Sequence, residues 1–150
     1  MNINFFMKEA IKEANHAYKN NEVPVGAILV DSKTKEIIGR SYNQINKEKN
    51  AIYHCELDLI IHSCKKLSSK YLYNTTMFVT LEPCLMCASA ISEVHISKLY
   101  FGAYDEKNGA IEKNKIFLKK KHTFETEIYG GIKEKDCQNL LKNYFIKLRK

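Results

Sequence analysis

Residues 75–94 read TTMFVTLEPCLMCASAISEV, and no other stretch of the chain says as much about its architecture. The first part, Thr75–Leu81, is rich in β-branched and apolar residues, which is typical of a buried strand. Pro83 follows two residues later. A proline suits the first turn of a helix, because its missing N–H would have no partner there. We therefore predict a strand over 75–81 and a helix that begins at Pro83 and runs to about Val94.

The hydrophobic pattern on both sides of this stretch predicts the remaining elements. Apolar residues at helical spacing predict a helix near the start of the chain, a second helix from about His54, and a terminal helix over Lys135–Leu148. Short apolar runs predict an antiparallel hairpin formed by Val25–Val30 and residues near 37–38, and further strands over Lys98–Tyr104 and Glu127–Tyr129.

This order of elements implies a mixed five-stranded sheet flanked by helices, a three-layer α/β/α sandwich of the α/β class. The chain has 150 residues and contains no repeat or Pro/Gly-rich linker. We therefore expect a single domain over residues 1–150.

The chain is basic and contains more than enough apolar residues for a packed core. Its 24 Lys and Arg against 17 Asp and Glu give a formal net charge of +7. A basic balance favours polyanionic partners such as nucleic acid. The alternative is that abundant lysine, asparagine and isoleucine reflect an A/T-rich coding sequence, so charge alone does not identify the partner.

The sequence also predicts the compartment. Residues 1–10 lack the cationic and apolar regions of a signal peptide, and no stretch approaches the roughly 20 apolar residues that a membrane span needs. The five cysteines are an odd number, which indicates reduced thiols or metal ligands. We expect a cytoplasmic protein with no membrane partner.

Two short groups of residues have the spacing of a metal site: His54-Cys55-Glu56 and Pro83-Cys84-Leu85-Met86-Cys87, each at the start of a predicted helix. Cys84 and Cys87 are i and i+3, so both thiols are expected on one helical face, where the helix dipole favours thiolates. His54 adds an imidazole nitrogen. Two sulfurs and one nitrogen suit zinc, and three protein ligands leave the open position that a catalytic zinc requires.

Glu56 gains a role from this site. A helix turns about 200° between i and i+2, so Glu56 should not bind the ion that His54 binds. At the helix start it can lean over the zinc, which lowers the pKa of a bound water from about 16 towards 7. A carboxylate there can act as base and then as acid.

Two other interpretations of the cysteines stay open from the residues alone. A Cys-x-x-Cys pair between a strand and a helix is also typical of thioredoxin-like redox proteins, although the upstream His-x-Glu and Pro83 favour zinc. A closed structural zinc site would need a fourth sulfur from Cys55, Cys64 or Cys137. Cys64 and Cys137 lie on apolar stripes, which favours core packing.

The pattern His54-x-Glu56 with Pro83-Cys84-x-x-Cys87 resembles the signature of zinc-dependent cytidine and adenosine deaminases. Within that superfamily the whole chain resembles the bacterial tRNA-specific adenosine deaminases. Three further segments carry this likeness: EVPVGA at 22–27, TLEPCLMCA at 80–88, and FGAYD at 101–105. The resemblance implies a cytidine deaminase-like fold, one zinc per subunit bound by His54, Cys84 and Cys87, and Glu56 as the proton shuttle.

The resemblance also implies substrate contacts. Asn43 would hydrogen-bond the adenine ring, and Val25 would line the base pocket. The backbone N–H of Cys55 would help to hold the oxygen ligand of the zinc, and Asp105 would contact the RNA chain. Without the resemblance, Asn43 would be an ordinary turn residue and Val25 an ordinary core residue. The implied reaction converts the wobble adenosine of a tRNA anticodon loop to inosine with release of ammonia, in a homodimer whose partner subunit contributes to the RNA surface.

The chain departs from the family pattern at several positions. Cys55 stands where alanine is common, and Tyr104 stands where arginine is common, so one phosphate contact is expected to be missing. The likeness thins over 109–121, where Lys119-Lys120-Lys121 offers replacement charge. These changes affect substrate contacts and leave the chemistry unaltered.

The sequence offers less evidence for the substrate than for the metal site. Residues 144–150 interleave aromatic and cationic side chains, which suits single-stranded RNA. The alternative is an amphipathic helix that buries its aromatics in the core. Two rival functions follow: a small-molecule deaminase acting on guanine, cytosine or a pyrimidine nucleotide, and a zinc-containing RNA-binding subunit without catalysis.

Overall fold

The computed structural model describes residues 1–112, 114–115, 117 and 124–150. The predicted basic run Lys119–Lys121 and His122 lie outside these residues. In chain order the elements are α1 Ile3–Lys19, β1 Gly26–Asp31, β2 Ile37–Tyr42, α2 Ile45–Glu48, α3 Cys55–Leu67, β3 Thr75–Leu81, α4 Leu85–Glu93, β4 Lys98–Ala103, β5 Glu127–Tyr129 and α5 Glu134–Leu148.

Within the described residues the strands form one five-stranded sheet in the order β2-β1-β3-β4-β5. β1 pairs antiparallel with both β2 and β3. β3, β4 and β5 run parallel to one another. The sheet is therefore mixed, as predicted, and the Val25–Val30 and 37–38 runs do form the expected antiparallel hairpin.

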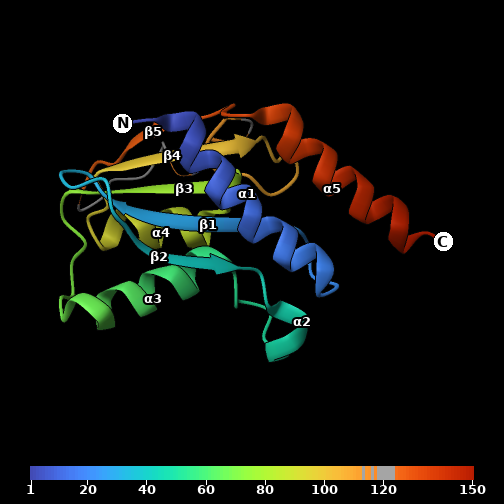
Figure 1. The fold of residues 1–150 in the computed structure, drawn as a ribbon, viewed down its shortest axis with the longest axis horizontal. Coiled ribbons are helices and arrows are strands. Elements are labelled where there is room, and N and C mark those ends of the chain that lie inside the picture. The colour runs from blue at the N-terminus through green and yellow to red at the C-terminus, as the bar shows by residue number, and fades with distance from the viewer. Residues whose placement is uncertain (113, 116, 118–123) are drawn as a thin grey trace.

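Helices cover both faces of this sheet (Figure 1). Alternate residues of β1 point to opposite sides: Leu29 packs with α3 and α4 in one core cluster, and Ile28 packs with α1 in the other. Within the described residues, α1 and α5 form one outer layer and α3 and α4 form the other. The predicted three-layer α/β/α sandwich is confirmed.

Gly26 shows how closely α1 lies on the sheet. A Cβ at this position would collide with the backbone of Ala10 and Ala14 in α1. Only glycine allows this approach, which fixes the start of β1 and, with it, the preceding residue Val25.

The start of α4 differs from the prediction. The helix begins at Leu85, and Cys84 is its extended N-cap residue, with φ −71° and ψ 171°. Pro83 therefore precedes the helix instead of occupying its first turn, and Cys84 lies at the helix end instead of on a helical face beside Cys87. The short helix α2 was not predicted, because four residues are too few to show a hydrophobic period.

None of the helices in the described part of the chain is both long enough and apolar enough to cross a membrane.

Candidate active site

The three predicted metal ligands lie together at the N-terminal ends of α3 and α4. His54 is the N-cap of α3; its Nδ1 lies 3.8 Å from Sγ of Cys84 and 3.5 Å from Sγ of Cys87. All three ligand atoms lie within 4.8 Å of one another. Ligands about 2.0 Å (nitrogen) and 2.3 Å (sulfur) from one tetrahedral zinc would be about 3.5 Å apart. The donor set and its spacing therefore fit zinc.

The electrostatics of the two thiols also suit a metal. A hydrogen bond from Cys87, with a smaller contribution from His54, lowers the pKa of Cys84 to about 4. The same hydrogen bond raises the pKa of Cys87 above its ordinary value. One thiolate is therefore available near neutral pH, and the charge of a bound cation favours ionisation of the second.

Glu56 lies beside the metal ligands in the first turn of α3 and is only 4% exposed. Burial raises the pKa of its carboxyl group above the ordinary value. Glu56 does not belong to the ligand group of His54, Cys84 and Cys87 within the described residues. A buried carboxyl with a raised pKa, close to the metal position but outside the ligand group, can take up and release a proton.

Asn43 and Cys55 are connected directly. The backbone N–H of Cys55 donates to Oδ1 of Asn43 over 3.0 Å, and the N–H of Asn43 donates to the carbonyl of Val25. The amide of Cys55, which the resemblance assigns to the oxygen ligand of the zinc, is therefore already engaged with Asn43. That assignment stays a prediction.

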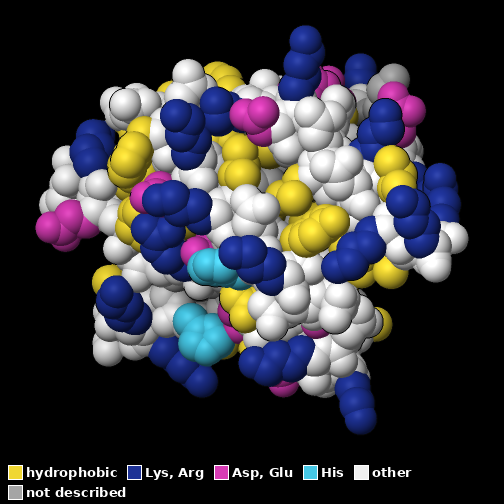
Figure 2. Space-filling view, turned by 45° about the vertical axis from the view of Figure 1, so that its right-hand side comes forward, with side chains coloured by type: hydrophobic (Ala, Val, Ile, Leu, Met, Phe, Trp, Pro, Cys, Tyr) yellow, Lys and Arg dark blue, Asp and Glu magenta, His cyan; other side chains and the backbone are white. Residues whose placement is uncertain are grey.

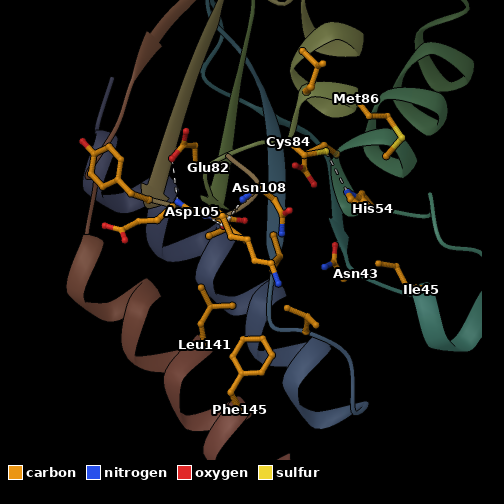
Figure 3. Close-up of a pocket in the computed structure, with 18 residues that line it drawn as sticks. Asn43, Ile45, His54, Glu82, Cys84, Met86, Asp105, Asn108, Leu141 and Phe145 are labelled. Carbon is orange, nitrogen blue, oxygen red and sulfur yellow. Dashed lines mark hydrogen bonds between the residues drawn. The ribbon is translucent and has the colours of Figure 1, made fainter. Parts of the chain in front are cut away.

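A cavity of about 940 Å³ opens over this group of residues. Five of the residues predicted from sequence to bind substrate or metal line it, and so does Glu56 (Figure 3); the five are Val25, Asn43, His54, Cys84 and Asp105. Cys55 and Cys87, whose side chains are fully buried, are not among the lining residues. The cavity thus brings the candidate catalytic groups and most of the candidate substrate contacts together.

Other lining residues were not predicted from sequence to face the substrate. Ile45, Met86, Tyr104 and Leu141 belong to this set. Phe145, from the aromatic and cationic segment that the sequence offered for RNA binding, also lines the cavity; it and Leu141 approach from α5, on the side opposite the metal ligands (Figure 3). On the face drawn in Figure 2, lysine and arginine side chains are scattered between apolar patches, and acidic side chains are few. This surface suits an anionic substrate that also stacks on apolar groups.

The terminal helix divides its aromatic residues between core and cavity. Tyr144 is buried, and its ring packs against Tyr18 at 6.0 Å between centroids. Phe145 is 45% exposed and Leu148 is 62% exposed. Burial of the aromatics in the core, the alternative that the sequence offered for this helix, therefore holds for Tyr144 and fails for Phe145.

The sequence analysis missed two buried glutamates, Glu82, which lines the cavity, and Glu22, which binds the neighbouring helix α2. Glu82 accepts hydrogen bonds from the backbone N–H groups of Asp105, Ile111 and Glu112. Glu22 accepts hydrogen bonds from the N–H groups of Asn46 and Lys47 at the start of α2. A glutamate at the end of an apolar strand, as at Glu82, is the sequence signal that could have identified the first.

The alternative ligands lie elsewhere. Cys64 is half-buried on α3 and packs against the core, and the Cys137 side chain lies in the core against Gly102. Among the residues that the structure describes, His16 lies next to Glu13, His62 bonds to Asp58, and His95 stacks on Tyr71. None of these side chains joins the ligand group within the described ranges.

Comparison with known proteins identifies the class of this site. Residues 1–103 match the family model for the cytidine and deoxycytidylate deaminase zinc-binding region. The chain is similar to the tRNA-specific adenosine deaminase of Rickettsia bellii, with 44% identity over 144 residues that cover 95% of this chain and 99% of the relative. It is 39% identical to that of Bacillus subtilis over 146 residues, covering 97% and 89% of the two chains.

Solved structures show the same fold. A structure from a study of A-to-I editing by tRNA:A34 deaminases at the wobble position superposes with a TM-score of 0.85 and 36% identity, covering 91% of this chain and 98% of that one. A guanine deaminase from Nitrosomonas europaea superposes with a TM-score of 0.81 at 15% identity, covering 94% and 83%. The second match shows that the fold alone does not select the substrate.

Proposed function

Because this chain belongs to the tRNA-specific adenosine deaminases, a family with the cytidine and deoxycytidylate deaminase zinc-binding region, we propose that it converts the wobble adenosine of a tRNA anticodon loop to inosine. Water replaces the exocyclic amino group of the base, and ammonia leaves. The observation that carries this proposal is the cluster of His54, Cys84 and Cys87, with His54, Cys84 and the buried Glu56 lining one cavity.

His54, Cys84 and Cys87 would hold the zinc, which would supply a Lewis acid that lowers the pKa of water to about 7. Glu56 accepts a proton from the attacking water and delivers it to the purine ring. It then carries the remaining proton of that water to the amino group, which leaves as ammonia. Its burial and raised pKa suit both directions of transfer.

The cavity walls orient the base. Asn43 presents its amide nitrogen as a donor for a ring nitrogen, while its oxygen stays bound to Cys55. Val25 supplies an apolar wall. Asp105, at the end of β4, is the proposed contact to the RNA chain. An anticodon loop is already single-stranded, so turning the adenosine out costs only a few kcal/mol.

Phe145 and the cationic end of α5 are proposed to hold the rest of the loop. Phe145 lines the cavity, and Lys147 lies over the ring of Tyr18 at 5.0 Å from its centroid. Aromatic rings stack on unpaired bases, and cations bind the phosphates between them.

We further propose a homodimer that works in the cytoplasm. The exposed apolar side chains of Ile52, which precedes α3, and Ile61, within α3, support a contact with a second copy. Sedimentation at micromolar concentration measures the mass of the protein in solution and tests this directly. A monomer at all concentrations would contradict the proposed dimer.

Activity measurements distinguish the proposal from its nearest alternative, a small-molecule deaminase. The zinc-loaded protein is incubated with total tRNA and, separately, with guanine, cytosine and adenosine, at low and high salt. We expect inosine in tRNA, little turnover of free bases, and a steep loss of activity with salt, because RNA binding releases counterions. Efficient, salt-independent turnover of a free base would favour the alternative.

A further inference from the structure

The end of β3 carries a buried carboxylate that no step of the deamination uses. Glu82 is 2% exposed. Its Oε1 accepts the N–H of Asp105 at 3.0 Å, and its Oε2 accepts the N–H groups of Ile111 and Glu112 at 2.9 Å each. No lysine, arginine or histidine of the described residues forms an ion pair with it. The negative charge is therefore balanced by backbone N–H groups, an arrangement that gives strong and directional hydrogen bonds.

All three donors belong to one segment of the chain. Residues 105–112 leave the end of β4, turn, and return so that Ile111 and Glu112 reach the same carboxylate as Asp105. The main chain is fastened there as well, since the N–H of Glu82 donates to the carbonyl of Ala103 and the N–H of Ala110 donates to that of Pro83. Glu82 thus binds the first residue and the last two residues of the turn.

Gly109 shows how close the contact is. A Cβ at this position would collide with the carboxyl group of Glu82 and with the carbonyl oxygen of Asp105. Gly109 also pairs with Cys84 in an isolated antiparallel bridge. The turn therefore packs directly on the carboxylate and on Cys84, the predicted metal ligand at the N-cap of α4.

The same turn forms one wall of the cavity. Asp105, Lys107 and Asn108 line it, and the Asp105 side chain accepts the N–H of Asn108 inside the turn (Figure 3). Glu82 lines the cavity beside this turn, but its oxygens bind backbone N–H groups and it does not belong to the ligand group of His54, Cys84 and Cys87 in the described residues. Removing the carboxylate should therefore disturb the wall and leave the metal group intact.

We propose that Glu82 is a positioning residue that holds the 105–112 turn in the shape required to contact the RNA chain. This inference rests on the proposed function, because it assigns the turn to the RNA substrate. Glu82 therefore affects how the protein binds the anticodon loop and takes no part in the reaction at the base.

The test compares Glu82→Gln with the wild-type protein, both loaded with zinc, on a tRNA anticodon stem-loop. The amide keeps the size of the side chain but places an NH₂ group against backbone N–H donors. We expect the KM for the stem-loop to rise about tenfold or more, with kcat within about twofold of wild type. Zinc content should stay at one per chain, and the amides of residues 105, 111 and 112 should exchange hydrogen faster.

Glu9→Gln is the matched control. Glu9 is also a buried carboxylate, but it is paired with Lys12 at 2.9 Å on α1 and does not line the cavity. Its substitution should leave the KM unchanged. Gly109→Ala is the second variant for the case in which Glu82→Gln does not fold, because it disturbs the same contact from the other side. It should raise the KM in the same way.

The outcomes separate this inference from the proposed function. If wild type forms inosine but neither Glu82→Gln nor Gly109→Ala raises the KM, the role of Glu82 is wrong and the function stands. If kcat and zinc content fall together with unchanged KM, Glu82 supports the metal site instead, which also overturns the inference. If wild type forms no inosine in tRNA, the proposed function itself fails.

Discussion

The backbone N–H of Cys55 donates to Oδ1 of Asn43 across 3.0 Å, so the first residue of α3 fixes the orientation of the amide at the cavity wall. Among the described residues, no hydrogen bond engages Nδ2 of Asn43. The bond therefore leaves the donor half of the amide for the substrate. In this side chain the oxygen has a structural role and the nitrogen is left for binding.

Asn43→Asp keeps the oxygen that Cys55 needs and removes the donor. We expect kcat/KM for tRNA to fall about 10- to 100-fold, as loss of a hydrogen bond worth about 1–3 kcal/mol implies, with zinc content and thermal midpoint nearly unchanged. Asn43→Ala should in addition lower the free energy of unfolding by about 1–3 kcal/mol, because the Cys55 N–H loses its partner. A kcat/KM for Asn43→Asp equal to that of wild type would contradict the proposed contact between Asn43 and the base.

Removal of one sulfur tests the metal site. Cys87→Ala leaves His54 and Cys84 as the only members of the ligand group in the described residues. We expect zinc, measured by elemental analysis, to fall well below one per chain, and inosine formation to be lost. Treatment of wild type with a chelator should lower its thermal midpoint, since a ligand that binds only the folded state stabilises it. Cys87→Ala with one zinc per chain would show that the ligand set is wrong.

Cys55 lies where its thiol donates to Oε1 of Glu56 at 3.2 Å, and burial raises the pKa of that thiol well above its ordinary value. Cys55→Ala removes this weak hydrogen bond and a small buried volume. We expect the free energy of unfolding to fall by about 1 kcal/mol, turnover to change by less than about fivefold, and zinc to stay bound. Cys64→Ala on the same helix is the control. Loss of zinc in Cys55→Ala alone would reveal a role as ligand.

Phe145 and Leu148 offer a matched pair on α5, because both are exposed and only Phe145 lines the cavity. Phe145→Ala should raise the KM for a tRNA stem-loop roughly tenfold, which is the scale of one lost stacking contact of about 1–3 kcal/mol. Leu148→Ala should leave the KM near wild type. Equal effects of the two substitutions would argue against stacking at Phe145.

The order of strands and helices was predictable because hydrophobic periodicity reports which face of an element is buried. The β3 run and the α3 spacing show this clearly, since both elements lie within the predicted ranges. The start of α4 was not predictable, because a proline is allowed both in the first turn of a helix and just before it, and here it comes before the N-cap Cys84. The four residues of the short helix α2 are too few to show a hydrophobic period.

The metal group was predictable because the ligands and Glu56 stand at fixed spacings within two short segments. The walls of the cavity were not, because they depend on how distant segments meet. The sequence allows Phe145 to face either the core or the RNA, and only the position of α5 beside the cavity decides between the two. Glu82 belongs to the motif at 80–88, but the sequence shows no role for this residue. Nothing in the sequence indicates that three N–H groups of a later turn converge on its carboxylate.

The most direct test of the central claim is inosine formation in tRNA by the zinc-loaded protein and by Glu56→Ala, with the zinc content of both measured on the same samples. The account predicts inosine at the wobble position with wild type, none with Glu56→Ala, and one zinc per chain in each. Inosine formation by Glu56→Ala, or its absence with zinc-loaded wild type, would contradict the account.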